Sequence, residues 1–330
     1  MPTIGKIGIL VSIALLSLPP AGADPGRYSF SLSPLQGILY GHAEEIVYKY
    51  PAEDQYLSEL LWDLKPLVFI GLGAELGPED PFKNNGFIAS TSLKYGLPLK
   101  TGIMEDRDWL NSNYEYLTNY SRHEAYSRNA ILMDLSAGYS WRLADYLAFS
   151  MVLEFSYMYF SWYAQDGYLQ YPKDHLGNYL YDQAWNRNLP KDAIYGKCIQ
   201  YNQNWFILSH GISLKGRINS YFSLEGNFNY SPLVYAAARD DHLLSKTIFW
   251  DYCSFGHYFS LGGKIFFKPY EKLDLSVSVL YTTVAGRRGT SYYAGSNTSN
   301  IRYQSANDGG AAFSALELEF AVRIFIFRKR

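Results

Sequence analysis

Long apolar runs are nearly absent from this chain of 330 residues. The one candidate, Ile7 to Leu18, is shorter than the roughly 18 to 20 apolar residues that a transmembrane helix requires. It follows Lys6 and precedes Ala21-Gly22-Ala23, which is the order of a secretory signal peptide and its cleavage site. The sequence therefore predicts that residues 1–23 are a signal peptide and that residues 24–330 form one exported domain.

The chain also has few cysteines and a small net charge. The chain has 2 cysteines, Cys198 and Cys253, with no CxxC motif and no His/Cys cluster of zinc-ligand spacing, so we expect neither a metal nor another cofactor. A predicted strand lies between the two cysteines, which favours free thiols over a disulfide. The net charge of -2 gives no electrostatic basis for binding nucleic acid.

Aromatic residues, in contrast, are abundant, with 31 Tyr and 19 Phe, while only 18% of the chain is charged. Aromatic girdles at two membrane interfaces would explain this composition. From about residue 28, apolar and polar residues alternate with period two, as in residues 273–281, Leu-Asp-Leu-Ser-Val-Ser-Val-Leu-Tyr. Such alternation predicts strands with two different faces.

Ten segments show this alternation, approximately at 29–47, 56–74, 86–100, 122–142, 146–163, 198–218, 221–237, 252–268, 273–284 and 309–327. Short turns alternate with long predicted loops, at about 103–121, 164–197, 238–251 and 285–308. An even number of antiparallel strands, short turns at one end and long loops at the other are typical of a closed outer-membrane barrel. The sequence predicts an all-β, ten-stranded antiparallel transmembrane barrel that extends above the membrane on the long-loop side.

The two faces of the predicted strands differ in charge. The apolar face is continuous and is expected to meet lipid, whereas the polar face carries both charge signs, as at Lys94, Glu317 and Arg323. Because ten strands enclose a narrow lumen, we expect an ion-paired, hydrogen-bonded interior and no open channel. A soluble β-sandwich with a polar outer face is the alternative fold.

Two short acidic stretches carry the candidate chemistry. Asp106 and Asp108 are two residues apart, and so are Asp240 and His242, which places each pair on one face of an extended chain. Two carboxylates so close raise one pKa, and an Asp beside a His stabilises the protonated ring. Together they can hold a water molecule and remove its proton. The ordinary alternative is two acidic loops, of which one happens to contain a histidine.

Five motifs extend this pattern over nearly the whole mature chain, namely Glu45-x-Val47-Tyr48, Ser58-x-Leu60-x-Trp62, Met104-x-Asp106-x-Asp108-Trp109, Ser121-Arg122-His123, and Phe222-x-Leu224-x-Gly226-x-Phe228-x-Tyr230-Ser231 leading into Asp240-x-His242. In this order and spacing they resemble the omptin family of outer-membrane endopeptidases. The resemblance implies a barrel in the cell outer membrane, with a protease site in an acidic groove that faces outside. It further implies protein or peptide substrates and contact with outer-membrane lipid, and we expect a monomer.

The resemblance assigns Asp106 and Asp108 to one catalytic pair, and Asp240 and His242 to the other. We expect His242, oriented by Asp240, to take a proton from a water molecule held opposite Asp106 and Asp108. Asp241 is an alternative partner for His242, although as its direct neighbour it should point to the other face. There is no nucleophile elbow and no Ser or Cys next to the histidine in sequence, which disfavours a covalent route.

The chain departs from the family pattern at position 238 and in the stretch Glu154 to Tyr163. Family members that cut between basic residues hold the substrate with two acids; Glu45 matches one, but Ala238 stands where the second is expected. A single carboxylate predicts a weakened preference for a basic residue. The family also binds lipopolysaccharide, which it needs for activity, through basic residues on its outer wall. The predicted fifth strand has no Lys or Arg in Glu154 to Tyr163, so lipopolysaccharide dependence is expected to be lost or placed elsewhere.

A different class of function also fits a barrel with long aromatic loops. The loops around Tyr168 to Tyr181 and Tyr292-Tyr293 are suited to contact host or matrix surfaces. The alternative to a protease is therefore a catalytically silent barrel of the same type that acts as an adhesin or structural protein. The presence of all four catalytic-type residues argues for the enzyme.

Overall fold

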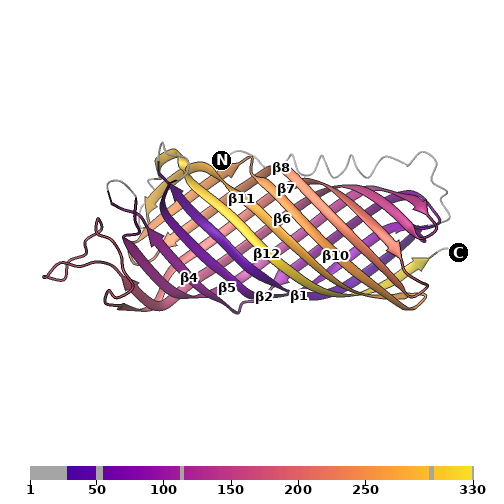
Figure 1. Cartoon of the computed structure of the whole chain (residues 1–330), viewed down its shortest axis with the longest axis horizontal. Coiled ribbons are helices and arrows are strands. Elements are labelled where there is room, and N and C mark those ends of the chain that lie inside the picture. The colour runs from indigo at the N-terminus through magenta and orange to yellow at the C-terminus, as the bar shows by residue number, and fades with distance from the viewer. Residues whose placement is uncertain (1–27, 50–54, 112–114, 297–300, 329–330) are drawn as a thin grey trace.

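The computed structural model describes residues 28–49, 55–111, 115–296 and 301–328. The predicted signal peptide, with its cleavage site after Ala23, lies outside the described residues. Within them the chain forms one antiparallel sheet that closes into a barrel, because β1 (Tyr28–Tyr48) pairs with both β2 and the last strand, β12 (Figure 1). The predicted all-β fold is confirmed, and the closed sheet excludes a β-sandwich.

Twelve strand segments make up ten strands. The segments are β1, β2 (Tyr56–Pro78), β3 (Gly86–Gly96), β4 (Lys100–Asp108), β5 (Asn119–Ala144), β6 (Leu147–Gln170), β7 (Asp192–Arg217), β8 (Phe222–His242), β9 (Thr247–Ser254), β10 (His257–Tyr270), β11 (Leu273–Gly295) and β12 (Arg302–Arg328). β3 and β4 lie along the same neighbours, β2 and β5, and are separated around Pro98, which has no N–H for the ladder. β9 and β10 both pair with β8 and β11 and are separated at Phe255, whose φ is 62°.

The strands run further than the alternation predicts. The predicted loops at 103–121, 164–197, 238–251 and 285–308 are wrong in extent: β4 continues to Asp108, β6 to Gln170, β8 to His242 and β11 to Gly295. At this end of the barrel the outward faces are polar, as at Lys100 and Arg239. Both faces of the strands then carry polar residues, which removes the period-two signal.

Apolar side chains cover the outer wall near the short turns. The exposed ones include Ile70, Leu72, Leu93, Leu135, Met151, Ile212, Leu214, Leu261, Ile265, Val277, Val279, Leu316, Leu318 and Ile324. This belt is the surface that a bilayer covers, which confirms that the apolar set faces outward. The strand ends that carry Asp106 and His242 lie beyond the belt. No helix long and apolar enough to cross a membrane occurs among the described residues.

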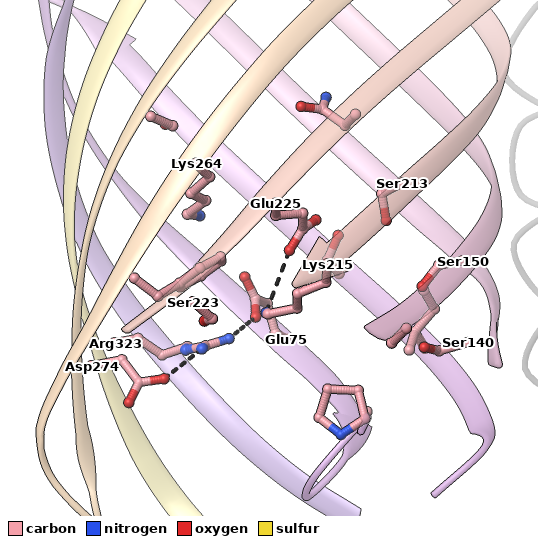
Figure 2. Close-up of a pocket in the computed structure, with 18 of the residues that line it drawn as sticks. Glu75, Ser140, Ser150, Ser213, Lys215, Ser223, Glu225, Lys264, Asp274 and Arg323 are labelled. Carbon is pink, nitrogen blue, oxygen red and sulfur yellow. Dashed lines mark hydrogen bonds and ion pairs between the residues drawn. The ribbon is translucent and has the colours of Figure 1, made fainter. Parts of the chain in front are cut away.

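The interior of the membrane half is charged and ion-paired. Lys94 Nζ lies 2.9 Å from Glu319 Oε2 and also pairs with Glu317. Arg323 bridges Glu75 and Asp274, at 2.6 and 2.5 Å (Figure 2). These groups line a cavity of about 660 Å³. The expected ion-paired interior is therefore confirmed, and it encloses this cavity.

An aromatic layer crosses the barrel above these charges. Trp62 of β2 stacks on Tyr201 of β7 with ring centroids 5.6 Å apart, and Phe160 of β6 stacks on Phe313 of β12 at 5.1 Å. Gln203 of β7 donates to the carbonyl oxygens of residues 44 and 312, on β1 and β12, at 3.1 and 3.4 Å. These side chains are fully buried and form the core of the barrel. They separate the charged membrane half from the outer end.

Candidate functional site

Two carboxylates lie on the inner face of β4 at its outer end. The register places Asp106 between Leu60 of β2 and Ser121 of β5. Asp108 follows two residues later and hydrogen-bonds to Ser58 and Asn119. Asp106 and Asp108 thus share a face, as the spacing predicts, but they lie on a strand and not in a loop. The strand holds them in place through the ladder on both sides.

The second predicted pair lies on the inner face of β8. His242 Nε2 and Asp240 Oδ2 form a close ion pair, and the Asp240 side chain is almost completely buried. Asp241 points to the outer wall, where it bonds to Arg239 Nη2 at 3.0 Å. The structure therefore pairs His242 with Asp240 and not with Asp241. The ring of Phe249 on β9 contacts His242 edge-on, with centroids 5.5 Å apart.

The two pairs face one another across the barrel mouth. Around the ring, β4 and β8 are separated by β5, β6 and β7 on one side and by β2, β1, β12, β11 and the β9–β10 strand on the other. His242 and Asp240 lie close enough to Asp106 to shift its pKa. The walls are thus in electrostatic contact, as expected from their positions on the third and seventh strands.

The proton affinities of these groups are linked. Burial raises the pKa of Asp106 well above its ordinary value, and the charge of Asp108 raises it further. Burial likewise raises the pKa of Asp108 to about 6. Burial alone would lower the pKa of His242, but Asp240, with help from Asp106 and Asp108, raises it to about 9. At neutral pH the site therefore holds an imidazolium against Asp240, opposite two carboxyl groups whose pKa values are both raised.

Glu45 is brought to the same site by β1. Its side chain is 3% exposed, and Oε2 has no hydrogen-bond partner among the described residues. Burial raises its pKa well above the ordinary value, as do the charges of Asp240, Asp251 and Asp106. Sequence analysis did not identify Asp251, because its place follows from the register of β8 against β9 and not from spacing along the chain.

Tyr171 is a second residue that sequence analysis missed. It follows β6 and packs edge-on against Tyr179, with ring centroids 5.3 Å apart. Burial raises the pKa of its hydroxyl, and the charges of Asp106 and Asp108 raise it further. Tyr171 therefore flanks the β4 carboxylates as a neutral hydroxyl. The only signal in the sequence was the density of tyrosine in the predicted loop.

The remaining candidates have structural surroundings. His123 Nδ1 lies 2.6 Å from the carbonyl oxygen of Asp166, and burial lowers the pKa of the ring. Cys198 on β7 and Cys253 on β9 are buried free thiols with β8 between them, as predicted. Across the described part of the chain, no three His, Cys, Asp or Glu side chains are grouped to hold a metal ion.

Three comparisons bear on this geometry. The Omptin family model matches residues 26–323. The plasminogen activator of Yersinia pestis is 28% identical over 235 residues, which is 70% of this chain and 68% of that protein. The crystal structure of the outer membrane protease OmpT from Escherichia coli superposes with a TM-score of 0.76 at 19% identity, covering 90% of this chain and 97% of that one. At this identity the solved structure is evidence for the fold alone.

Proposed function

This chain belongs to the omptin family, and we propose that it is an outer-membrane protease whose site opens to the outside of the cell. The observation that carries the proposal is the Asp240–His242 ion pair in electrostatic contact with Asp106 and Asp108 on the opposite wall. A buried histidine held by one carboxylate and facing two more is the arrangement that water activation requires.

In the proposed mechanism, water attacks the peptide carbonyl directly. A water molecule sits between the walls, with Asp106 and Asp108 accepting its hydrogen bonds. The neutral form of His242 takes the proton of this water as the oxygen attacks, and Asp240 stabilises the resulting imidazolium. The imidazolium then returns the proton to the leaving amine. Because Asp240 holds Nε2 of the ring, the other ring nitrogen, Nδ1, is the one that takes the proton of the water.

Protein or peptide substrates would enter from the open end of the barrel. We propose that Glu45, whose Oε2 is buried and unpartnered, binds a basic side chain of the substrate. A cation at this position would offset the burial and the repulsion by other carboxylates that raise the pKa of Glu45. The substrate would therefore be oriented by charge before its peptide bond reaches the water.

Lipopolysaccharide is the accessory molecule to be tested. The outer wall beyond the apolar belt carries basic groups on β4 and β5, of which Lys100 pairs with Glu124 and Arg128 bonds to Gln200. Because these groups are exposed on the outer wall, we propose that they, and not the stretch Glu154 to Tyr163 of β6, contact lipopolysaccharide. Activity with and without this lipid measures its contribution.

The test is peptide cleavage by the refolded mature protein. The barrel would be incubated in detergent, with and without lipopolysaccharide, with a mixed peptide library read by mass spectrometry. An Asp240→Ala plus His242→Ala variant is the control. Cleavage by the wild type alone supports the protease. If the folded wild type cleaves no peptide with or without lipopolysaccharide, the protease proposal is contradicted and the adhesin or structural barrel is favoured.

A further inference from the structure

A carboxylate outside the two catalytic pairs lies near Glu45. Asp251 is on β9, where the register pairs it with Ala238 of β8. It is 5% exposed and is among the charges that raise the pKa of Glu45. Burial raises the pKa of Asp251 itself to about 7, and Asp240 contributes to this shift. Asp251 is therefore in electrostatic contact with both Glu45 and Asp240, at the level of position 238.

The surrounding strands are shaped to hold Asp251. Ser291 of β11 donates a short hydrogen bond from Oγ to Asp251 Oδ1, which fixes the orientation of the carboxylate. On β12, a Cβ added to Gly309 would lie 2.2 Å from the same oxygen. A larger residue at position 309 would collide with the carboxylate. The side chains of β11 and β12 thus leave a defined place for Asp251.

Among the described residues, no cation is paired with the carboxylates in this place. Glu45 Oε2 is buried without a hydrogen-bond partner. The charged groups that shift the pKa of Glu45 are all acidic, and so are those that shift the pKa of Asp251, namely Asp240 and Asp308. Buried carboxylates without a cation are costly. The arrangement is therefore suited to a cation that arrives from outside the chain.

We propose that Asp251 joins Glu45 in a specificity pocket that binds a Lys or Arg side chain of the substrate, a proposal that rests on the protease function. The two carboxylates come from β1 and β9, so a guanidinium can bond to both from its planar fork. Asp251 then supplies, from the neighbouring strand, the carboxylate that Ala238 lacks. The sequence predicts a weakened basic preference, whereas Asp251 would preserve it.

The test compares matched peptides that carry arginine, citrulline or alanine before the scissile bond. Citrulline keeps the shape of arginine without its charge. In Asp251→Asn, kcat/KM for the arginine peptide should fall by about 10- to 100-fold, with the citrulline peptide changed by less than about threefold. Asp241→Asn removes a carboxylate from the outer wall and is the matched control, with no change expected. Adding Ala238→Asp to Asp251→Asn should restore arginine preference.

The outcomes separate the pocket from the chemistry. Equal losses on the arginine and citrulline peptides, or an unchanged arginine preference in folded Asp251→Asn, would overturn the proposal. Equilibrium binding of the same peptides to His242→Ala, with and without Asp251→Asn, gives a readout that needs no cleavage. Arginine-selective binding that depends on Asp251 supports the pocket even if no peptide is cut, and binding without that selectivity overturns it.

Discussion

The two ends of this barrel both bury carboxylates, but they differ in whether these carboxylates have a cationic partner. In the membrane half, Lys94 contacts Glu317 and Glu319, and Arg323 contacts Glu75 and Asp274. At the outer end, Glu45 and Asp251 are buried as deeply and burial raises the pKa of both, but the charges that add to this shift are those of other carboxylates. Glu317, Glu319, Glu75 and Asp274 therefore have cationic partners within the protein, whereas Glu45 and Asp251 would gain one only from a bound cation.

This difference separates structural charges from functional ones. A buried ion pair that keeps both partners stabilises the fold mainly because breaking it would strand a charge. Buried carboxylates left without a cation lower stability, and they persist where their chemistry is used. The aromatic layer that includes Trp62 and Tyr201 lies between the two ends and keeps these charge systems apart. Substitutions at the two ends should therefore affect different properties.

The largest effect should come from the histidine at the outer end. His242→Ala removes the group that accepts the water proton, so kcat should fall by roughly 10²- to 10⁴-fold. The free energy of unfolding should also fall, because Asp240, which is 1% exposed, loses the cation with which it is paired, so kcat is expressed per folded molecule. Steady-state cleavage of an arginine peptide measures the first quantity and urea unfolding in lipid vesicles the second. Full activity in His242→Ala would remove histidine from the mechanism.

The converse effect is expected in the membrane half. Lys94→Met leaves Glu317 and Glu319 buried without their cation and should lower the free energy of unfolding by about 3 to 5 kcal/mol. The kcat of the molecules that remain folded should stay within about twofold of wild type, since the aromatic layer separates Lys94 from the site. Leu93→Ala, on the lipid-facing side of the same strand, controls for substitution in β3. A large loss of kcat with unchanged stability would contradict the comparison.

The pH profile tests the Asp240–His242 pair at the outer end. Because the neutral ring accepts the proton and the pKa of His242 is about 9, kcat/KM of the wild type should rise with pH up to about 9. Asp240→Asn removes the charge that stabilises the imidazolium, so the rising limb should move to lower pH by about 1 to 3 units and reach a lower plateau. An unmoved limb would show that another group controls the rate.

The fold could be predicted because, in a strand that crosses a bilayer, apolar residues that face lipid alternate with polar residues that face the lumen. In the membrane half one face meets lipid and the other a charged lumen, so residues 273–281 show a clear period of two. Above the membrane the outward face is polar too: Arg239 and Asp241 alternate with Asp240 and His242, and the pattern looks like a loop. Although this segment was predicted as a loop, the prediction that Asp106 and Asp108 share a face is correct, because residues two apart share a face in any extended segment.

The acidic environment of Glu45 could not be predicted in full. Local spacing identifies Ala238 as a missing carboxylate, but it does not show what lies opposite on the next strand. Asp251 is thirteen positions further along and meets Ala238 only through the turn and register of β8 and β9. Such cross-strand neighbours depend on the length of the strands, which the lost alternation concealed.

The most direct test of the central comparison is Glu45→Gln, measured for both stability and cleavage beside Lys94→Met. If the outer carboxylates are kept for substrate binding, kcat/KM for an arginine peptide should fall by about 10- to 100-fold. The free energy of unfolding should be unchanged or higher, since a buried unpaired charge is removed. A loss of several kcal/mol in stability with undiminished arginine cleavage would show that Glu45 serves the fold, as Lys94 does, and would contradict its role in substrate binding.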